Sequence, residues 1–84
     1  MVGAVNYLCQ GLESYRKIDL LLKLTRISSE NMQMALSDHL ANNFTVAQAA
    51  SINNVNHSNL ALAIKKLNAV AETVELLHEL KLVS

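Results

Sequence analysis

The 84-residue sequence has no proline and no tryptophan, and its two glycines are Gly3 and Gly11. Such a chain has few residues that interrupt a helix, and alanine, leucine and other helix formers dominate it. Strand-like alternation of apolar and polar residues is absent as well. The sequence therefore predicts an all-α fold.

The sequence has a single cysteine and shows neither a signal peptide nor a membrane span. The one cysteine, Cys9, cannot form a disulfide within the chain, which is typical of a reducing compartment, although a bridge between chains stays open. The first 12 residues lack the basic start of a signal peptide. The long uncharged run of residues 39–64 holds too many asparagines for a bilayer. We expect a cytoplasmic protein that does not contact a membrane.

The sequence also lacks recognisable catalytic chemistry. The histidines, at positions 39, 57 and 78, and the cysteine do not have the spacing of metal ligands, and no glycine-rich phosphate loop is present. Asp38 and His39 are adjacent and would point to different sides of a helix, which removes the one tempting acid–base pair. We expect no enzymatic activity, no metal, no cofactor and no small-molecule ligand.

Apolar periodicity predicts helices in the first half of the chain. Over residues 1–12 the pattern favours a helix, although a frayed terminus fits nearly as well; its apolar positions are Val5, Leu8, Cys9 and Leu12. Over residues 13–24 the apolar positions are Tyr15, Ile18, Leu21 and Leu22. Ser28 or Ser29 can cap a third helix, residues 30–41, with a buried stripe of Met32, Ala35, Leu36 and Leu40.

Residues 44–67 have the pattern of a helix-turn-helix. Thr45 and Gln48 stand in the spacing of a capping box, which predicts a helix that begins at Val46. Asn53 and Asn54 follow shortly after, and asparagine tolerates the left-handed conformation that ends a helix and turns the chain. The turn is therefore expected at residues 53–55.

A second helix should follow the turn. Asn56 can cap it, and its apolar face, spaced i, i+3, i+4 and i+7, is Leu60, Ala63, Ile64 and Leu67. In a helix-turn-helix the second helix enters the major groove by its N-terminal residues and the first crosses the DNA backbone. A plain helical hairpin is the alternative, in which the asparagines only form turns and the lysines only face solvent.

The residues expected to bind DNA lie on the outer face of this motif. We expect contacts to base edges or phosphates from Asn56, His57, Ser58 and Lys65, contacts to the backbone from Thr45, Gln48 and Lys66, and an outward position for Leu62. The net charge is zero, which favours nucleic-acid binding only weakly. However, no carboxylate lies between Asp38 and Glu72, so the motif itself is mildly basic.

The helical pattern continues without a break past Leu67. It predicts a C-terminal helix over residues 57–82, with Glu72, Glu75 and Glu79 outside and with candidate dimerisation residues Val70, Val74, Leu77 and Leu80 in the segment 68–82. A chain of this length should form a single small domain, residues 1–84, whose limited core would gain from a partner subunit. We expect a homodimer or higher oligomer.

Residues 29–67, about half of the chain, resemble the PapB-like family of adhesin (fimbrial) biosynthesis transcription regulators. The resemblance rests, in order and without a gap, on Ser29-Glu30, Asp38-His39-Leu40, Asn42-Asn43, Thr45, Asn56 and Ile64-Lys65-Lys66-Leu67. The sequence departs from the family pattern at Val46-Ala47, where a basic pair is usual, and over residues 57–60.

The resemblance implies a bacterial regulator of fimbrial or adhesin operons, associated with the nucleoid when bound, that occupies clustered A/T-rich sites on double-stranded DNA as a dimer or higher oligomer. A second hypothesis belongs to a different class of protein. In it the chain is a small helical interaction module, an antagonist that pairs with another regulator through its C-terminal leucines and does not bind DNA. The DNA-binding hypothesis is the one that the capping and spacing favour.

Overall fold

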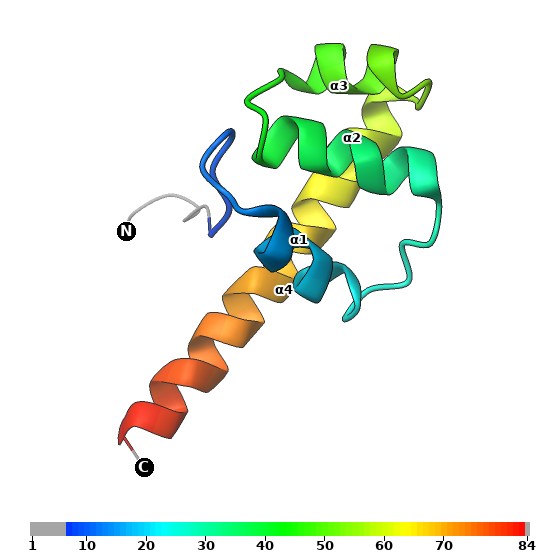
Figure 1. The fold of residues 1–84 in the computed structure, drawn as a ribbon. Coiled ribbons are helices and arrows are strands. Elements are labelled where there is room, and N and C mark those ends of the chain that lie inside the picture. Colours follow the sequence, from blue (N-terminus) through cyan, green and yellow to red (C-terminus); the bar gives the residue numbers. More distant parts are fainter. Residues whose placement is uncertain (1–6, 84) are drawn as a thin grey trace.

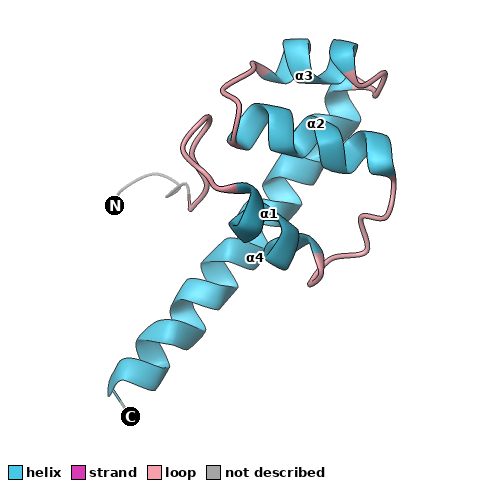
Figure 2. Cartoon of the chain, in the orientation of Figure 1, coloured by secondary structure: helices cyan, strands magenta, loops and turns pink. Residues whose placement is uncertain are grey.

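The structure is a computed structural model that describes residues 7–83 of the chain. It contains the helices α1 (Tyr15–Leu22), α2 (Glu30–Leu40), α3 (Val46–Ile52) and α4 (His57–Val83), and residues 7–83 form no strand (Figures 1 and 2). The all-α fold and the long C-terminal helix predicted from the sequence are thus confirmed. No helix in this part of the chain is long and apolar enough to span a membrane.

Side-chain caps determine where the first three helices begin. The hydroxyl oxygens of Ser14, Ser29 and Thr45 accept hydrogen bonds from backbone N–H groups in the first turns of α1, α2 and α3. The predicted caps at Ser29 and Thr45 are therefore confirmed. Helix α1 is shorter than the periodic stretch of residues 13–24, because Ser14 starts it and the chain leaves the helix after Leu22.

The core lies where α1, α2 and α3 cover the first half of α4. The largest side chains that are less than 2% exposed are Ile18, Leu36, Leu40, Leu60 and Leu67. The last buried residue of α4 among the described side chains is Ala71, and beyond it the helix projects away from the other three (Figure 1). Small side chains at Ala49 and Ala50 on α3 are also buried, which lets this helix lie close to its neighbours.

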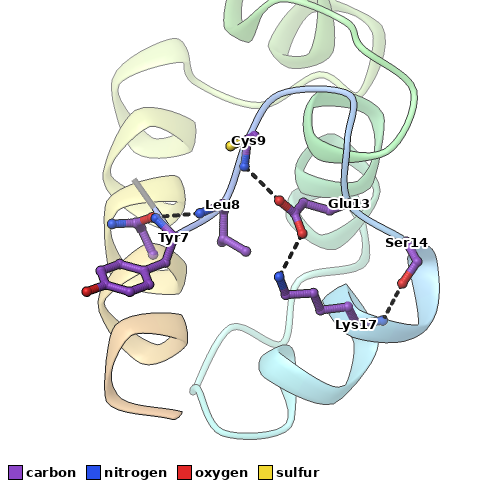
Figure 3. Close-up of polar contacts among 7 residues, drawn as sticks. Tyr7, Leu8, Cys9, Glu13, Ser14 and Lys17 are labelled. Atoms are coloured by element: carbon purple, nitrogen blue, oxygen red, sulfur yellow. Dashed lines mark hydrogen bonds and ion pairs between the residues drawn. The ribbon is translucent and has the colours of Figure 1, made fainter. Parts of the chain in front are cut away.

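The helix expected over residues 1–12 is wrong for the part of this stretch that the structure describes; its first six positions lie outside the described residues. Residues 7–12 instead form bends and a turn, with Gly11 at a φ of +73°. The Oδ1 atom of Asn68 on α4 accepts the N–H groups of Tyr7 and Leu8, at 2.7 and 3.0 Å (Figure 3). Bonds to distant groups thus replace the ladder of a helix, which periodicity alone could not reveal.

Glu13 fastens the same segment to the start of α1 (Figure 3). Its carboxylate accepts the N–H of Cys9 at 2.7 Å and pairs with the Nζ atom of Lys17 at 2.9 Å. Burial opposes ionisation of this carboxyl, but the bond from Cys9 and the charge and hydrogen bond of Lys17 outweigh it, so the pKa of Glu13 is lowered. The charged Glu13 side chain thus links residue 9 to the first turn of α1.

The last turn of α2 holds both ends of α3. At the start of α3, the backbone carbonyl of Asp38 accepts the N–H of Phe44 at 3.0 Å, and the Nδ1 atom of His39 lies 2.8 Å from the Phe44 carbonyl oxygen. At its end, the carboxylate of Asp38 accepts the side-chain N–H of Asn53 at 2.8 Å. The same carboxylate accepts the side-chain N–H of Asn42, in the segment before α3, at 2.9 Å. We call these contacts the α2 clamp.

Replacing Asp38 by alanine tests the clamp. The variant leaves the buried amide of Asn53 without one of its two acceptors, and hydrogen bonds to a charged group are each worth about 1.5–3 kcal/mol. We expect the free energy of unfolding to fall by about 1–3 kcal/mol in urea denaturation. The control is Asp19→Ala, at an exposed position of α1, which should change the free energy of unfolding by less than about 0.5 kcal/mol. Equal effects of the two variants would show that the Asp38 carboxylate contributes nothing to the clamp.

Candidate nucleic-acid interface

Helices α3 and α4 are joined by the turn predicted at residues 53–55. Asn54 has a φ of +55°, the left-handed conformation for which asparagine is suited, and the N–H of Val55 bonds back to the carbonyl of Ala50 at 2.9 Å. Asn53 ends α3 and directs its side-chain N–H groups to Asp38 and to the carbonyl of Ala49. The direction of the chain as it enters α4 is therefore fixed by backbone and side-chain bonds together.

Asn56 caps α4. Its Oδ1 atom accepts the N–H groups of Ser58 at 2.8 Å and Asn59 at 3.2 Å. This confirms the cap predicted at Asn56. The first turn of α4 is exposed and directly follows the connection between α3 and α4. The first N–H groups of a helix and its dipole favour an anion, so this end of α4 is suited to a phosphate group.

The outer face of the first half of α4 presents the side chains expected there. The inner face is as predicted, since Leu60, Ala63 and Leu67 are buried and Ile64 is half-buried. On the outer face four of the candidate residues line one shallow hollow, which they share with Ala61, Ile64 and Asn68; these four are His57, Ser58, Leu62 and Lys65. Leu62 is 56% exposed, so its side chain is available for apolar contact with a partner.

The other candidates lie outside this hollow. Lys66 is exposed but does not line the hollow. Thr45 and Gln48 are exposed at the start of α3, where they form a capping box: the Thr45 hydroxyl accepts the Gln48 N–H at 3.1 Å, and the Gln48 side-chain oxygen accepts the Thr45 N–H at 2.9 Å. Both oxygens accept a bond within the capping box, which leaves the Gln48 amide hydrogens and the Thr45 hydroxyl hydrogen as donors for a ligand.

All the carboxylates of α4 lie in its second half. Its first half carries Lys65 and Lys66 and no carboxylate, whereas Glu72, Glu75 and Glu79 follow in the second half, all of them exposed. The outer face of α3 has no charged side chain. The surface formed by α3 and the first turns of α4 is therefore polar and weakly basic, and the acidic end of the molecule lies along the projecting part of α4 (Figure 1).

The residues expected at a subunit interface lie on the projecting half of α4. Val70 is half-buried against the core, and Val74, Leu77 and Leu80 are 38%, 62% and 62% exposed. Leu24, from the segment after α1, lines a hollow together with Val70, Val74 and Leu77. An apolar strip thus continues from the core to the surface, where no residue of the described chain covers it.

Sequence reasoning missed the groups that position the interface. Asp38 and Asn53 are 15 residues apart, and nothing in their spacing indicates that they meet. Asn68 anchors the segment of Tyr7, a role that nothing in the sequence indicated. His39 is 9% exposed; since a carbonyl oxygen only accepts, its Nδ1 atom carries the hydrogen that is donated to Phe44.

One comparison with known proteins finds a matching family. Residues 3–80 match the family model described as PapB, adhesin biosynthesis transcription regulatory protein. This covers nearly the whole chain, whereas the sequence pattern had indicated only residues 29–67. No curated protein and no solved structure gives a significant match.

Substitutions of Asn56 separate the cap from other roles of this residue. Asn56→Ala removes the acceptor for two N–H groups and should lower the free energy of unfolding by about 1 kcal/mol. Asn56→Asp keeps an acceptor and places a negative charge at the helix N-terminus, so it should be as stable as the parent. Urea denaturation of the three proteins is the measurement. An alanine variant as stable as the parent would contradict the assignment of Asn56 as an effective cap.

Proposed function

Because the chain belongs to the PapB family of adhesin biosynthesis transcription regulatory proteins, we propose that it regulates transcription by binding double-stranded DNA with α3 and the first turns of α4. Membership of this family indicates a transcriptional regulator of adhesin biosynthesis, which is not an enzyme class. The DNA-binding surface, its residues and the oligomeric state go beyond that membership and are argued below.

The observation that carries the proposal is the exposed face at the start of α4. His57, Ser58 and Lys65 line one hollow and offer side chains that can bond to base edges or phosphates, with Leu62 beside them for apolar contact with a base. No carboxylate lies between residues 38 and 72 to repel the phosphates. In the arrangement proposed, this face enters the major groove.

Helix α3 would lie across the DNA backbone. Thr45 and Gln48 begin this helix, and the amide hydrogens of Gln48 are available to donate to a phosphate oxygen. Lys66, at the side of α4, would contact the backbone as well. Asn56 would act mainly through its cap, because it directs the N-terminal N–H groups of α4 toward the DNA.

Two copies would be needed for useful affinity. With Lys65 and Lys66 as the cations of each motif, a dimer would neutralise on the order of four to six phosphates, so binding should be weak at physiological salt. We propose that Val70, Val74, Leu77 and Leu80 of α4 join two copies, and that their reading faces then lie about 34 Å apart, one turn of DNA. Dimers would load cooperatively on the clustered A/T-rich sites that the family resemblance implies.

The first prediction concerns DNA binding and salt. The protein, titrated at low salt onto labelled DNA from upstream of its own operon, should bind in preference to random duplex, and log affinity should fall with log salt by about 0.9 for each phosphate contacted. Lys65→Glu should weaken binding and flatten this slope. Arg26→Glu is the matched control, because it makes the same change of charge at an exposed site outside α3 and α4.

Three results would contradict this proposal. The first is the absence of binding, and the second is binding without preference over random duplex. The third is equal loss with Lys65→Glu and Arg26→Glu, which would mean that the overall charge and not the α4 face matters. Co-purification with a different regulator, together with DNA affinity that is indifferent to Lys65, would instead favour a protein-binding module, a role that the exposed leucines of α4 would also suit.

The second prediction concerns the dimer. Val74→Asp together with Leu77→Asp would place unpaired charges in an apolar interface, which is costly, so the subunits should separate in analytical ultracentrifugation. DNA binding should fall with dimerisation, although neither residue would touch DNA. Leu12→Asp, at a residue that is 80% exposed and far from α4 in the sequence, should change neither property. A double variant that stays dimeric, or one that is monomeric and binds DNA as well as the parent, would show that this helix is not the dimer element.

A further inference from the structure

The outer side of α1 and of its C-cap residue Lys23 carries a stripe of two basic residues and one leucine, beside the exposed carboxylate of Asp19. Arg16, Leu20 and Lys23 follow one another at i, i+4 and i+7, a spacing that places three side chains on one side of a helix. All three are exposed, and Leu20 is 47% exposed. Arg16 and Leu20 also line hollows on either side of this face. We call these three residues the basic stripe.

The projecting half of α4 carries a stripe with the same spacing and the opposite charge. Glu72, Leu76 and Glu79 also stand at i, i+4 and i+7, all three are exposed, and Leu76 is 48% exposed. We call these residues the acidic stripe. Each stripe thus has a half-exposed leucine with one charge on either side, and the spans between the two charges are equal.

The two stripes do not neutralise each other within one chain. Among the side chains that the structure describes, the ion pair that lies within 4.0 Å joins Lys17 to Glu13, and neither of these residues belongs to a stripe. Val74 and Glu75 of α4 line a hollow together with Arg16 and Leu20 of α1, and the end of α4 projects beyond α1 (Figure 1). Both charged surfaces therefore remain available to another molecule.

We propose that the basic stripe of one molecule binds the acidic stripe of a second copy of this chain. Packing Leu20 against Leu76 of the other copy places Arg16 and Lys23 next to the two glutamates, whichever way the helices run, because the spacings are equal. Such a match of charge and spacing is what two helices need for specific pairing. Because each chain carries both the basic and the acidic stripe, a second copy of the chain offers the matching surface.

This contact differs from the proposed dimer interface. At about 100° per residue, Glu72 and Glu79 lie on the side of α4 opposite to Val70, Val74 and Leu77. Leu80, the fourth residue of the proposed interface, lies between the two surfaces, about 40° from Leu76. One molecule can therefore use the apolar strip with one neighbour and its stripes with others. Because the two stripes are different surfaces, the contact is heterologous, and it can add dimers one after another without closing.

The inference rests on the proposed function, since it assigns the contact between dimers that bind neighbouring sites. Exposed ion pairs are individually weak and are screened by salt, so the contact should be slight in dilute solution. DNA that holds two dimers side by side raises their effective concentration, and the same contact then favours loading of adjacent sites.

Reversing the charge of each stripe tests the proposal without DNA. One variant carries Arg16→Glu with Lys23→Glu, and the other carries Glu72→Lys with Glu79→Lys. In sedimentation velocity at low salt, the parent should form species larger than a dimer as its concentration rises, and 0.5 M salt should remove them, a level at which the screening length falls to about 4–5 Å. Each variant alone should stop at the dimer, because its two stripes then have charges of the same sign.

An equal mixture of the two variants should recover the larger species, since the acidic α4 of one then meets the basic α1 of the other. Arg26→Glu, the control, should behave as the parent, and circular dichroism should show unchanged helix content in all four proteins. The proposal is overturned if the parent stops at the dimer, if either variant alone still assembles, or if the mixture stays dimeric. Failure of the parent to bind upstream DNA would instead refute the proposed function. The contact between the two stripes would then still be tested by sedimentation, which needs no DNA.

Discussion

The arrangement of the proposed reading surface depends on the α2 clamp. Asp38 and His39 are consecutive residues, yet between them they bond to the residue before α3 and to the residue that ends it. Helix α3 has only 7 residues and one buried pair of alanines, too little apolar surface to fix its orientation by packing alone. The hydrogen bonds of the α2 clamp set the orientation of α3, because hydrogen bonds require particular distances and angles.

The clamp is itself held from the other side of α2. The N–H of Gly11 bonds to the carbonyl of His39 at 3.1 Å, and the N–H of Glu13 bonds to that of Leu40 at 2.9 Å. These two carbonyls lie in the last turn of α2, where a helix leaves such groups unpaired. The segment before α1 thus completes the end of α2, and Asn68 on α4 anchors the start of that segment. Every helix consequently contributes to the position of α3.

The fold could be predicted from the sequence where short-range chemistry decides it. The caps at Ser29, one of two serines predicted for that role, at Thr45 and at Asn56 lie within three residues of the groups they bind, and periodicity identified the buried faces of α2 and α4. Prediction failed for residues 7–12, where apolar spacing suggested a helix but the backbone bonds to Asn68, about 60 residues away, and turns at Gly11. The link from Asp38 to Asn53 was missed for the same reason. The roles of the surface residues, which the fold does not determine, stay predictions.

The most direct test is a backbone amide chemical-shift map of the intact protein, recorded while a duplex from upstream of its operon, long enough for one dimer only, is added. If the clamp presents the start of α4 to DNA, the largest shifts should fall on residues 56–66 and on the first turn of α3, with small shifts along α1 and residues 74–80. Largest shifts on α1 or on the projecting half of α4, with residues 56–66 unaffected, would contradict the account.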